Sequence, residues 1–80
     1  MMHMKEVYAD KYRQIGLKIA CYRKLRGLTQ EQLAERLELS PAFIGHVEAP
    51  NINKAVSLDT LFDIAAALDV PPYKFLIFDE

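Results

Sequence analysis

The sequence has little of what several classes of protein require. Cys21 is the one cysteine among 80 residues, which excludes an internal disulfide framework. No grouping of cysteine and histidine has the spacing of metal ligands, and we expect neither a metal nor another cofactor. No apolar run approaches the roughly 18 residues that a membrane span needs, and the first residues lack the apolar stretch of a signal peptide. We therefore expect one cytoplasmic domain without membrane contact.

Catalytic patterns are missing as well. The sequence shows no nucleophile with a matching base, no pair of carboxylates in a pocket-forming context and no glycine-rich phosphate loop. We do not expect an enzyme.

The net charge of −1 conceals an uneven distribution. Residues 1–28 carry seven basic side chains against two acidic ones, and residues 29–80 carry three against nine. This asymmetry fits a basic surface for nucleic acid. It fits equally well a set of solvated helix faces with internal ion pairs, so charge does not decide between the two.

Apolar residues at steps of three and four predict a first helix from about residue 6 to residue 26. Its apolar positions are Tyr8, Tyr12, Ile15, Ile19, Tyr22 and Leu25. Gly27 follows where a helix C-terminal glycine belongs. We expect Cys21 to be a small buried residue of this helix.

Two short helices with strong start signals come next. Thr29 and Gln32 form the pattern of a capping box, which predicts a helix over residues 30–37. Ser40 and Pro41 give a second start signal, for a helix over residues 41–49. Two short helices joined by three residues are typical of a helix-turn-helix.

The remaining chain predicts two more helical segments. Ser57 caps a fourth helix, and Pro72 begins a last helical turn through Leu76. The expected buried face of the fourth helix is Leu58, Leu61, Phe62, Ala65 and Leu68. No segment alternates as a strand does, so the sequence predicts an all-α fold of five helices. The apolar residues 75–78 can pack against the first helix or form a dimer seam, and we expect a mixture of the two.

At this point the sequence resembles the Xre/Cro-type, phage lambda repressor-like family of helix-turn-helix regulators. The resemblance covers residues 12–76, with residues 1–11 extending the first helix and residues 77–80 as a C-terminal tail. It rests on several motifs in the right order, among them Arg23-Lys24-Leu25-Arg26-Gly27-Leu28-Thr29-Gln30-Glu31-Gln32-Leu33-Ala34, Leu39-Ser40, Val47-Glu48 and Ser57-Leu58-Asp59-Thr60-Leu61. The resemblance implies a five-helix domain that binds operator DNA as a homodimer.

The resemblance also implies roles for single residues. The helix over residues 41–49 would enter the major groove with its N-terminal residues nearest the bases. Gln30 would meet a phosphate, and Arg23 and Glu48 would form a structural ion pair. The candidates for DNA contact are Gln30, Ser40, Pro41, Ala42, Phe43, His46, Asn51 and Lys54.

The recognition positions depart from the family in their chemistry. Pro41 and Ala42 have no side-chain donor, although Ala42 can touch a thymine methyl group. Phe43 either contacts bases or packs against neighbouring helices, and His46 is either a DNA contact or an ordinary surface residue. Glu38 stands where the family often has the glycine of the turn.

Two functions therefore stay open. The first is a sequence-specific DNA-binding transcriptional regulator, expected to act as a repressor. The alternative is a protein-interaction module or antitoxin-type partner that keeps the repressor fold with weak or non-specific DNA binding. The apolar residues Pro41, Ala42 and Phe43 support the alternative.

Overall fold

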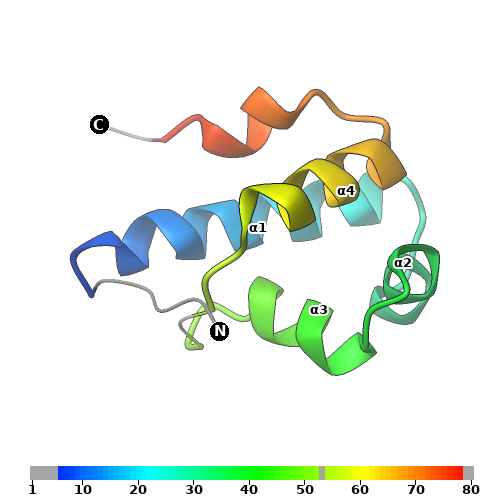
Figure 1. Ribbon diagram of the computed structural model, residues 1–80, viewed down its shortest axis with the longest axis horizontal. Helices are drawn as coiled ribbons and strands as arrows, with labels where there is room; N and C mark the ends of the chain where they lie inside the picture. The colour runs from blue at the N-terminus through cyan, green and yellow to red at the C-terminus, as the bar shows by residue number, and fades with distance from the viewer. Residues whose placement is uncertain (1–5, 53, 79–80) are drawn as a thin grey trace.

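The computed structural model describes residues 6–52 and 54–78 (Figure 1). Their helices are η1 (Glu6–Tyr8), α1 (Ala9–Leu25), α2 (Gln30–Leu37), α3 (Pro41–Glu48), α4 (Leu58–Leu68) and η2 (Pro72–Leu76). No strand occurs in this part of the chain, and the predicted all-α class is confirmed. The count differs in detail, because the predicted fifth helix is the 3-10 helix η2 and the first helix opens with the 3-10 turn η1.

Two predicted segments are described only in part. The extension over residues 1–11 is described from Glu6 onward, and the tail over residues 77–80 is described up to Phe78. The rest of both segments, together with Asn53, lies outside the described residues. The domain boundaries stay predictions.

Three of the α-helices begin at a side-chain cap, as predicted. The Thr29 hydroxyl accepts a hydrogen bond from the Gln32 amide at 3.0 Å, and the Gln32 side chain accepts one from the Thr29 amide at 2.8 Å. This reciprocal pair is a capping box. Ser40 and Ser57 cap α3 and α4 in the same way, by accepting from an amide three residues on.

The turn between α2 and α3 contains a residue in the left-handed region. Glu38 has φ 56° and ψ 37°, and the Leu39 amide donates back to the Ala34 carbonyl at 2.9 Å. A non-glycine residue in this conformation costs about 1–2 kcal/mol. The Leu39 bond satisfies a carbonyl that the end of α2 would otherwise leave unpaired, and it fixes the direction in which the chain leaves.

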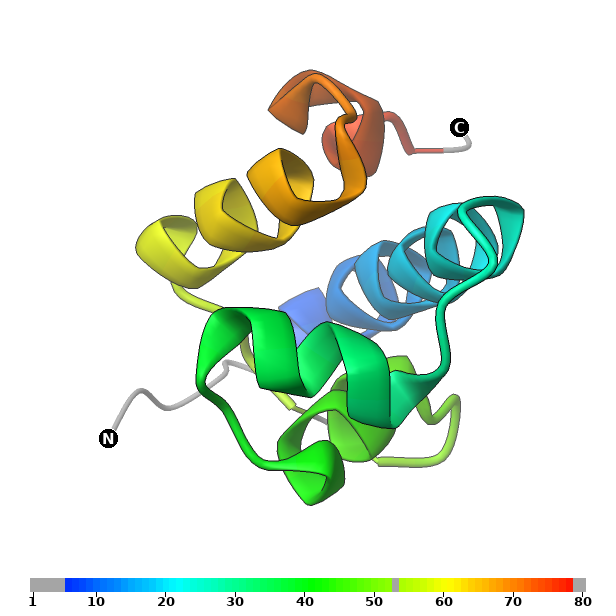
Figure 2. The same cartoon turned by 90° about the vertical axis from the view of Figure 1, so that its right-hand side faces the viewer.

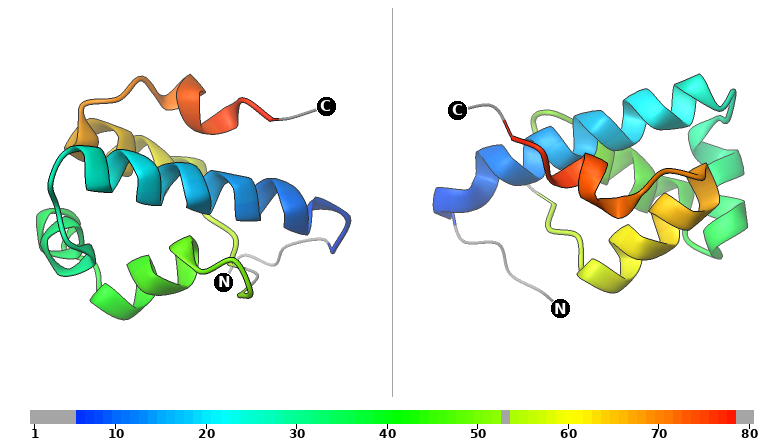
Figure 3. Two further views of the ribbon diagram at one scale, coloured as in Figure 1. Left: turned by 180° about the vertical axis from the view of Figure 1, so that it is seen from behind. Right: turned by 90° about the horizontal axis from the view of Figure 1, so that it is seen from above.

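Helix α1 lies at the centre of the molecule. Figures 1 and 2 show α3 on one side of α1 and η2 on the other, with α4 beside both α1 and η2. The two views of Figure 3 agree with this order. The core residues are Ile15, Ile19, Leu33, Ala34, Ile44, Val47, Leu61, Ile64, Ala65, Leu68, Val70 and Phe75. The Phe75 ring is fully buried and meets the Tyr22 ring edge to face, with 5.5 Å between centroids.

The crossing of α1 and α3 requires a glycine. A Cβ atom added to Gly16 would overlap the carbonyl oxygen of Val47 in α3. From sequence alone, a glycine inside a helix indicates only a loss of helix propensity. Gly16 is required by its tertiary contact with Val47, and no local sequence pattern predicts that contact.

Three sequence predictions about burial are wrong. Leu58 and Phe62 are 60% and 48% exposed, while Ile64 takes the inward position on α4. Cys21 is exposed on α1 rather than buried. The inward face of each helix is the one that meets its neighbours, and an apolar residue just outside that face stays in solvent.

Candidate nucleic-acid interface

Helix α3 turns one face inward and leaves the opposite face open. Ile44, Val47 and Glu48 are buried against the other helices. Pro41, Ala42 and His46 are exposed. Successive residues of an α-helix lie about 100° apart, so Ala42 and His46 are nearly opposite Ile44. The structure thus places Ala42 and His46 on one outward face, and Pro41 is exposed at the first turn of the helix.

Gln30 lies beside one flank of α3. Gly45, the residue after Ile44, faces α2, and a Cβ atom built there would be 3.5 Å from the Gln30 Oε1 atom. This is an ordinary van der Waals separation. The first residue of α2 therefore borders the exposed face of α3.

The other flank carries Phe43 and Lys54. The Phe43 ring is partly buried and packs against the core. The Lys54 ammonium lies over this ring, 5.4 Å from its centroid. This contact joins the loop after α3 to the helix itself. Both residues were predicted from the sequence as candidate DNA contacts. Their contact with each other was not, since no helical period links positions 43 and 54.

Ser40 and Asn51 border the same region. The Ser40 hydroxyl is exposed and accepts from the Phe43 amide at 3.1 Å, as a helix cap. Asn51 is exposed in the loop that also contains Lys54.

Behind α3, a buried ion pair fastens the helix to α1. Arg23 Nε donates to Glu48 Oε2 at 2.7 Å, and Nη2 donates to Oε1 at 2.8 Å. The third guanidinium nitrogen donates to the Leu28 carbonyl at 2.7 Å. The hydrogen bonds to Glu48 raise the pKa of Arg23, so the guanidinium stays charged despite its burial.

Gln30 belongs to the same network. Its Nε2 atom donates to Glu48 Oε1 at 3.0 Å. An amide group has two N–H bonds, and this contact uses one of them while it orients the other. Glu48 thus links the buried ion pair to a residue at the edge of the exposed face.

Four described basic residues of the N-terminal half are held in contacts within the molecule. Arg23 is buried, and Arg26 donates to the carbonyls of Leu68 and Asp69 at the end of α4.

Lys11 and Lys18 lie over the Phe78 ring, 5.0 and 5.7 Å from its centroid. The C-terminal segment passes along the side of α1 away from α3 (Figure 1). Most of the charge excess therefore serves internal contacts.

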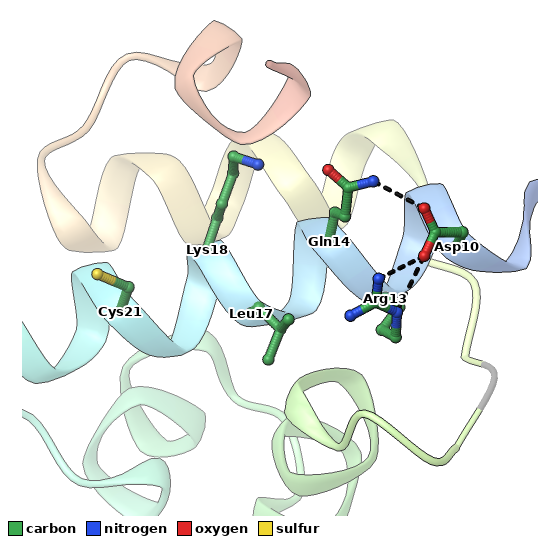
Figure 4. Close-up of a pocket in the computed structure, with 6 residues that line it drawn as sticks. All are labelled: Asp10, Arg13, Gln14, Leu17, Lys18 and Cys21. Carbon is green, nitrogen blue, oxygen red and sulfur yellow. Dashed lines mark hydrogen bonds and ion pairs between the residues drawn. The ribbon is translucent and has the colours of Figure 1, made fainter. Parts of the chain in front are cut away.

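The outward face of α1 also pairs its own charges (Figure 4). Arg13 Nε and Gln14 Nε2 donate to the Asp10 carboxylate at 3.1 and 2.8 Å. These hydrogen bonds hold the pKa of Asp10 below its usual value. Lys18 and Cys21 project from the same stretch of helix (Figure 4).

The described residues hold no group of three or more potential metal ligands. Among the same residues, none of the helices has the length and apolar character to cross a membrane.

Comparison with known proteins decides the family. The family model described as "Helix-turn-helix" matches residues 19–75, which include α2, the Glu38 turn and α3. The chain belongs to the Xre/lambda repressor-like family of helix-turn-helix proteins. As a member of this family, it is a DNA-binding transcriptional regulator.

Two curated proteins, a control protein and an immunity repressor, are similar to this chain. The chain is 39% identical over 75 residues to the control protein C.SmaI of Serratia marcescens, an alignment that covers 94% of this chain and 79% of the relative. It is 41% identical over 56 residues to the immunity repressor protein of Bacillus phage phi105, which covers 70% of this chain. The aligned part is 38% of that repressor, so the helix-turn-helix protein corresponds to only a part of it.

Two solved structures share the fold. The restriction-modification controller protein C.AhdI from Aeromonas hydrophila superposes with a TM-score of 0.75 at 30% identity, over 82% of this chain and 97% of that one. The hypothetical transcription factor NHTF from Neisseria gives a TM-score of 0.77 at 26% identity, over 85% and 74% of the two chains. This chain therefore shares its fold with both of these proteins.

Proposed function

We propose that this protein binds operator DNA as a homodimer and represses transcription by occupying the operator. The observation that carries the proposal is the exposed face of α3, which has a polar group on each flank. A protein of this kind acts in the cytoplasm, by binding and without catalysis.

The proposed complex places α3 in the major groove, which is about 12 Å wide and admits one helix. Ala42 and Pro41 then approach the base edges, where Ala42 can contact a thymine methyl group. His46 is the hydrogen-bonding side chain of the outward face. A phosphate backbone borders the groove on each side, within reach of Gln30 on one flank and Lys54 on the other.

Ser40 and Asn51 complete the proposed interface. The N-terminus of α3 presents backbone N–H groups that favour an anion, and Ser40 lies there. Asn51 follows the C-terminal end of α3, where its side-chain amide can donate to a phosphate. These contacts fix the orientation of α3 and carry no sequence information.

Selection of bound duplexes from a random DNA pool tests the proposal. We expect a palindromic site whose half-sites lie about 10–10.5 base pairs apart or a multiple of that distance. Binding to this site should be at least ~10³-fold tighter than binding to scrambled DNA. His46→Ala should change the selected sequence, whereas Asp63→Asn, an exposed change on α4, should leave it unchanged.

The alternative, a protein-interaction module, has one specific observation in its favour. Pro41 and Ala42 are exposed and have no side-chain donor for a base edge. Weak binding of equal strength to every duplex would contradict the operator proposal and favour this alternative.

A further inference from the structure

The contact between Phe43 and Lys54 lies on one flank of α3, and its geometry indicates a different role for each residue. Phe43 lies about 100° from the buried Ile44 and about 100° from the outward Ala42. Its ring is partly buried against the core, so it does not project from the helix as a base-reading side chain would. Phe43 is therefore on the flank of α3, between the core and the exposed face.

Lys54 reaches that flank from the loop after α3. Its ammonium is 5.4 Å from the Phe43 centroid, within the ~6 Å range of a cation–π contact. A lysine in a loop has a long side chain with many rotamers, and binding a phosphate would have to order it. The ring reduces that cost because the ammonium is already held against α3.

The same ammonium can serve the ring and a phosphate together. It has three N–H bonds, and the ring faces only one side of it. When a helix lies in the major groove, the flanks of the helix are the parts nearest to the two phosphate backbones. An ammonium held on a flank is thus at the place where a phosphate arrives.

We propose that Phe43 is a positioning residue, whose ring holds Lys54 for a backbone phosphate, and that it does not read a base. The inference rests on the proposed DNA binding and deepens it. It assigns the Phe43–Lys54 pair to affinity that is independent of sequence, and it leaves sequence readout to the outward face of α3.

The test is a double-mutant cycle of Phe43→Leu and Lys54→Gln, measured as affinity for the selected duplex and for scrambled DNA at several salt concentrations. Lys54→Gln should weaken binding to both duplexes and reduce the slope of log K against log salt by about 0.9 per protomer. Phe43→Leu should weaken binding about two- to fivefold on both duplexes, the range of an exposed cation–π contact. In the Lys54→Gln background, Phe43→Leu should have no further effect.

Two controls separate positioning from mere packing. Phe43→Tyr keeps the aromatic ring and should bind DNA as the parent does. Full binding by Phe43→Tyr would show that the weaker binding of Phe43→Leu comes from the loss of the aromatic ring. Lys74→Gln removes a lysine of η2, which lies on the side of α1 away from α3, and it should leave the salt slope unchanged. Thermal unfolding of each variant shows that the folded protein is being compared.

Two results would contradict the inference. If Phe43→Leu changes the base selected at one position of the half-site, Phe43 reads that base. If the effects of the two substitutions simply add, the ring does not act through Lys54. Both of these results leave operator binding intact, whereas a parent protein that binds no DNA overturns the proposed function as well.

Discussion

Gly16 and Gly45 both lie inside helices, but their surroundings differ. Gly16→Ala places a methyl group on the carbonyl oxygen of Val47, and a backbone atom cannot move aside as a side chain can. We expect a loss of about 1–3 kcal/mol in the free energy of unfolding, and more if α1 and α3 must separate. Urea denaturation measures it.

Gly45→Ala is the matched substitution. Its methyl group would meet only the Gln30 Oε1 atom, at 3.5 Å, and alanine favours the helix by about 0.5–1 kcal/mol. We expect a small gain in stability. A gain of similar size at both positions would show that helix propensity dominates and that the α1–α3 crossing does not require a glycine at position 16.

At the scale of helices, the ion pair between Arg23 and Glu48 joins α1 to α3. Glu48→Gln keeps the shape of the side chain but leaves the buried guanidinium without its counter-charge. We expect it to cost about 3–5 kcal/mol in the free energy of unfolding. Chemical denaturation of Glu48→Gln, Arg23→Met and the double variant gives the coupling between them.

The double variant should lose less than the sum of the two single changes, because it no longer buries a lone charge. Asp10→Asn, which breaks the exposed pair with Arg13, is the control and should change stability little. If Glu48→Gln is as mild as Asp10→Asn, the pair does not hold the two helices together.

Local signals predicted the helices but not the contacts between elements. The ion pair between Arg23 and Glu48 was expected only from the family resemblance. Thr29, Ser40 and Ser57 mark their helix starts because a cap is a bond within four residues. The buried face of α4 could not be predicted in the same way, because apolar residues lie on most sides of that helix. Its packing against α1, α2 and η2 decides which of them turn inward. Leu58 and Ile64 show the result, the first exposed and the second buried.

The candidate interface shows the same division. The exposure of Ala42 and His46 follows from the helical period of α3. The bond from Gln30 to Glu48 and the position of Lys54 over Phe43 join residues 18 and 11 positions apart in different elements. Such contacts depend on how the elements pack, which no sequence period encodes.

At the scale of the molecule, apolar surface remains on the side of α1 away from α3. Of the apolar residues 75–78, Phe75 is buried in the core, whereas Leu76 and Ile77 are 42% and 55% exposed. A groove of about 350 Å³ opens there between α1, the start of α4 and the C-terminal segment. Leu58 and Leu76 line it. A small domain gains stability by sharing such surface, and a second copy seated there leaves α3 uncovered.

Leu58→Lys tests whether this groove is the seam of the proposed dimer. The side chain is 60% exposed, so the substitution should leave the fold of one protomer intact while it places a charge in the seam. Light scattering after gel filtration should give a dimer for the parent and a monomer for the variant. The melting temperature of the parent should also rise with protein concentration.

Operator affinity should fall when the dimer dissociates, because each monomer then binds one half-site alone. Linked half-sites raise affinity by about 10²-fold or more, and that gain should be lost in Leu58→Lys. Leu25→Lys adds the same charge at a 70% exposed position at the far end of α1, and it should change neither mass nor affinity. A Leu58→Lys protein that stays dimeric with full affinity would contradict a seam at the groove. The two α3 helices would then have to be brought together by another surface.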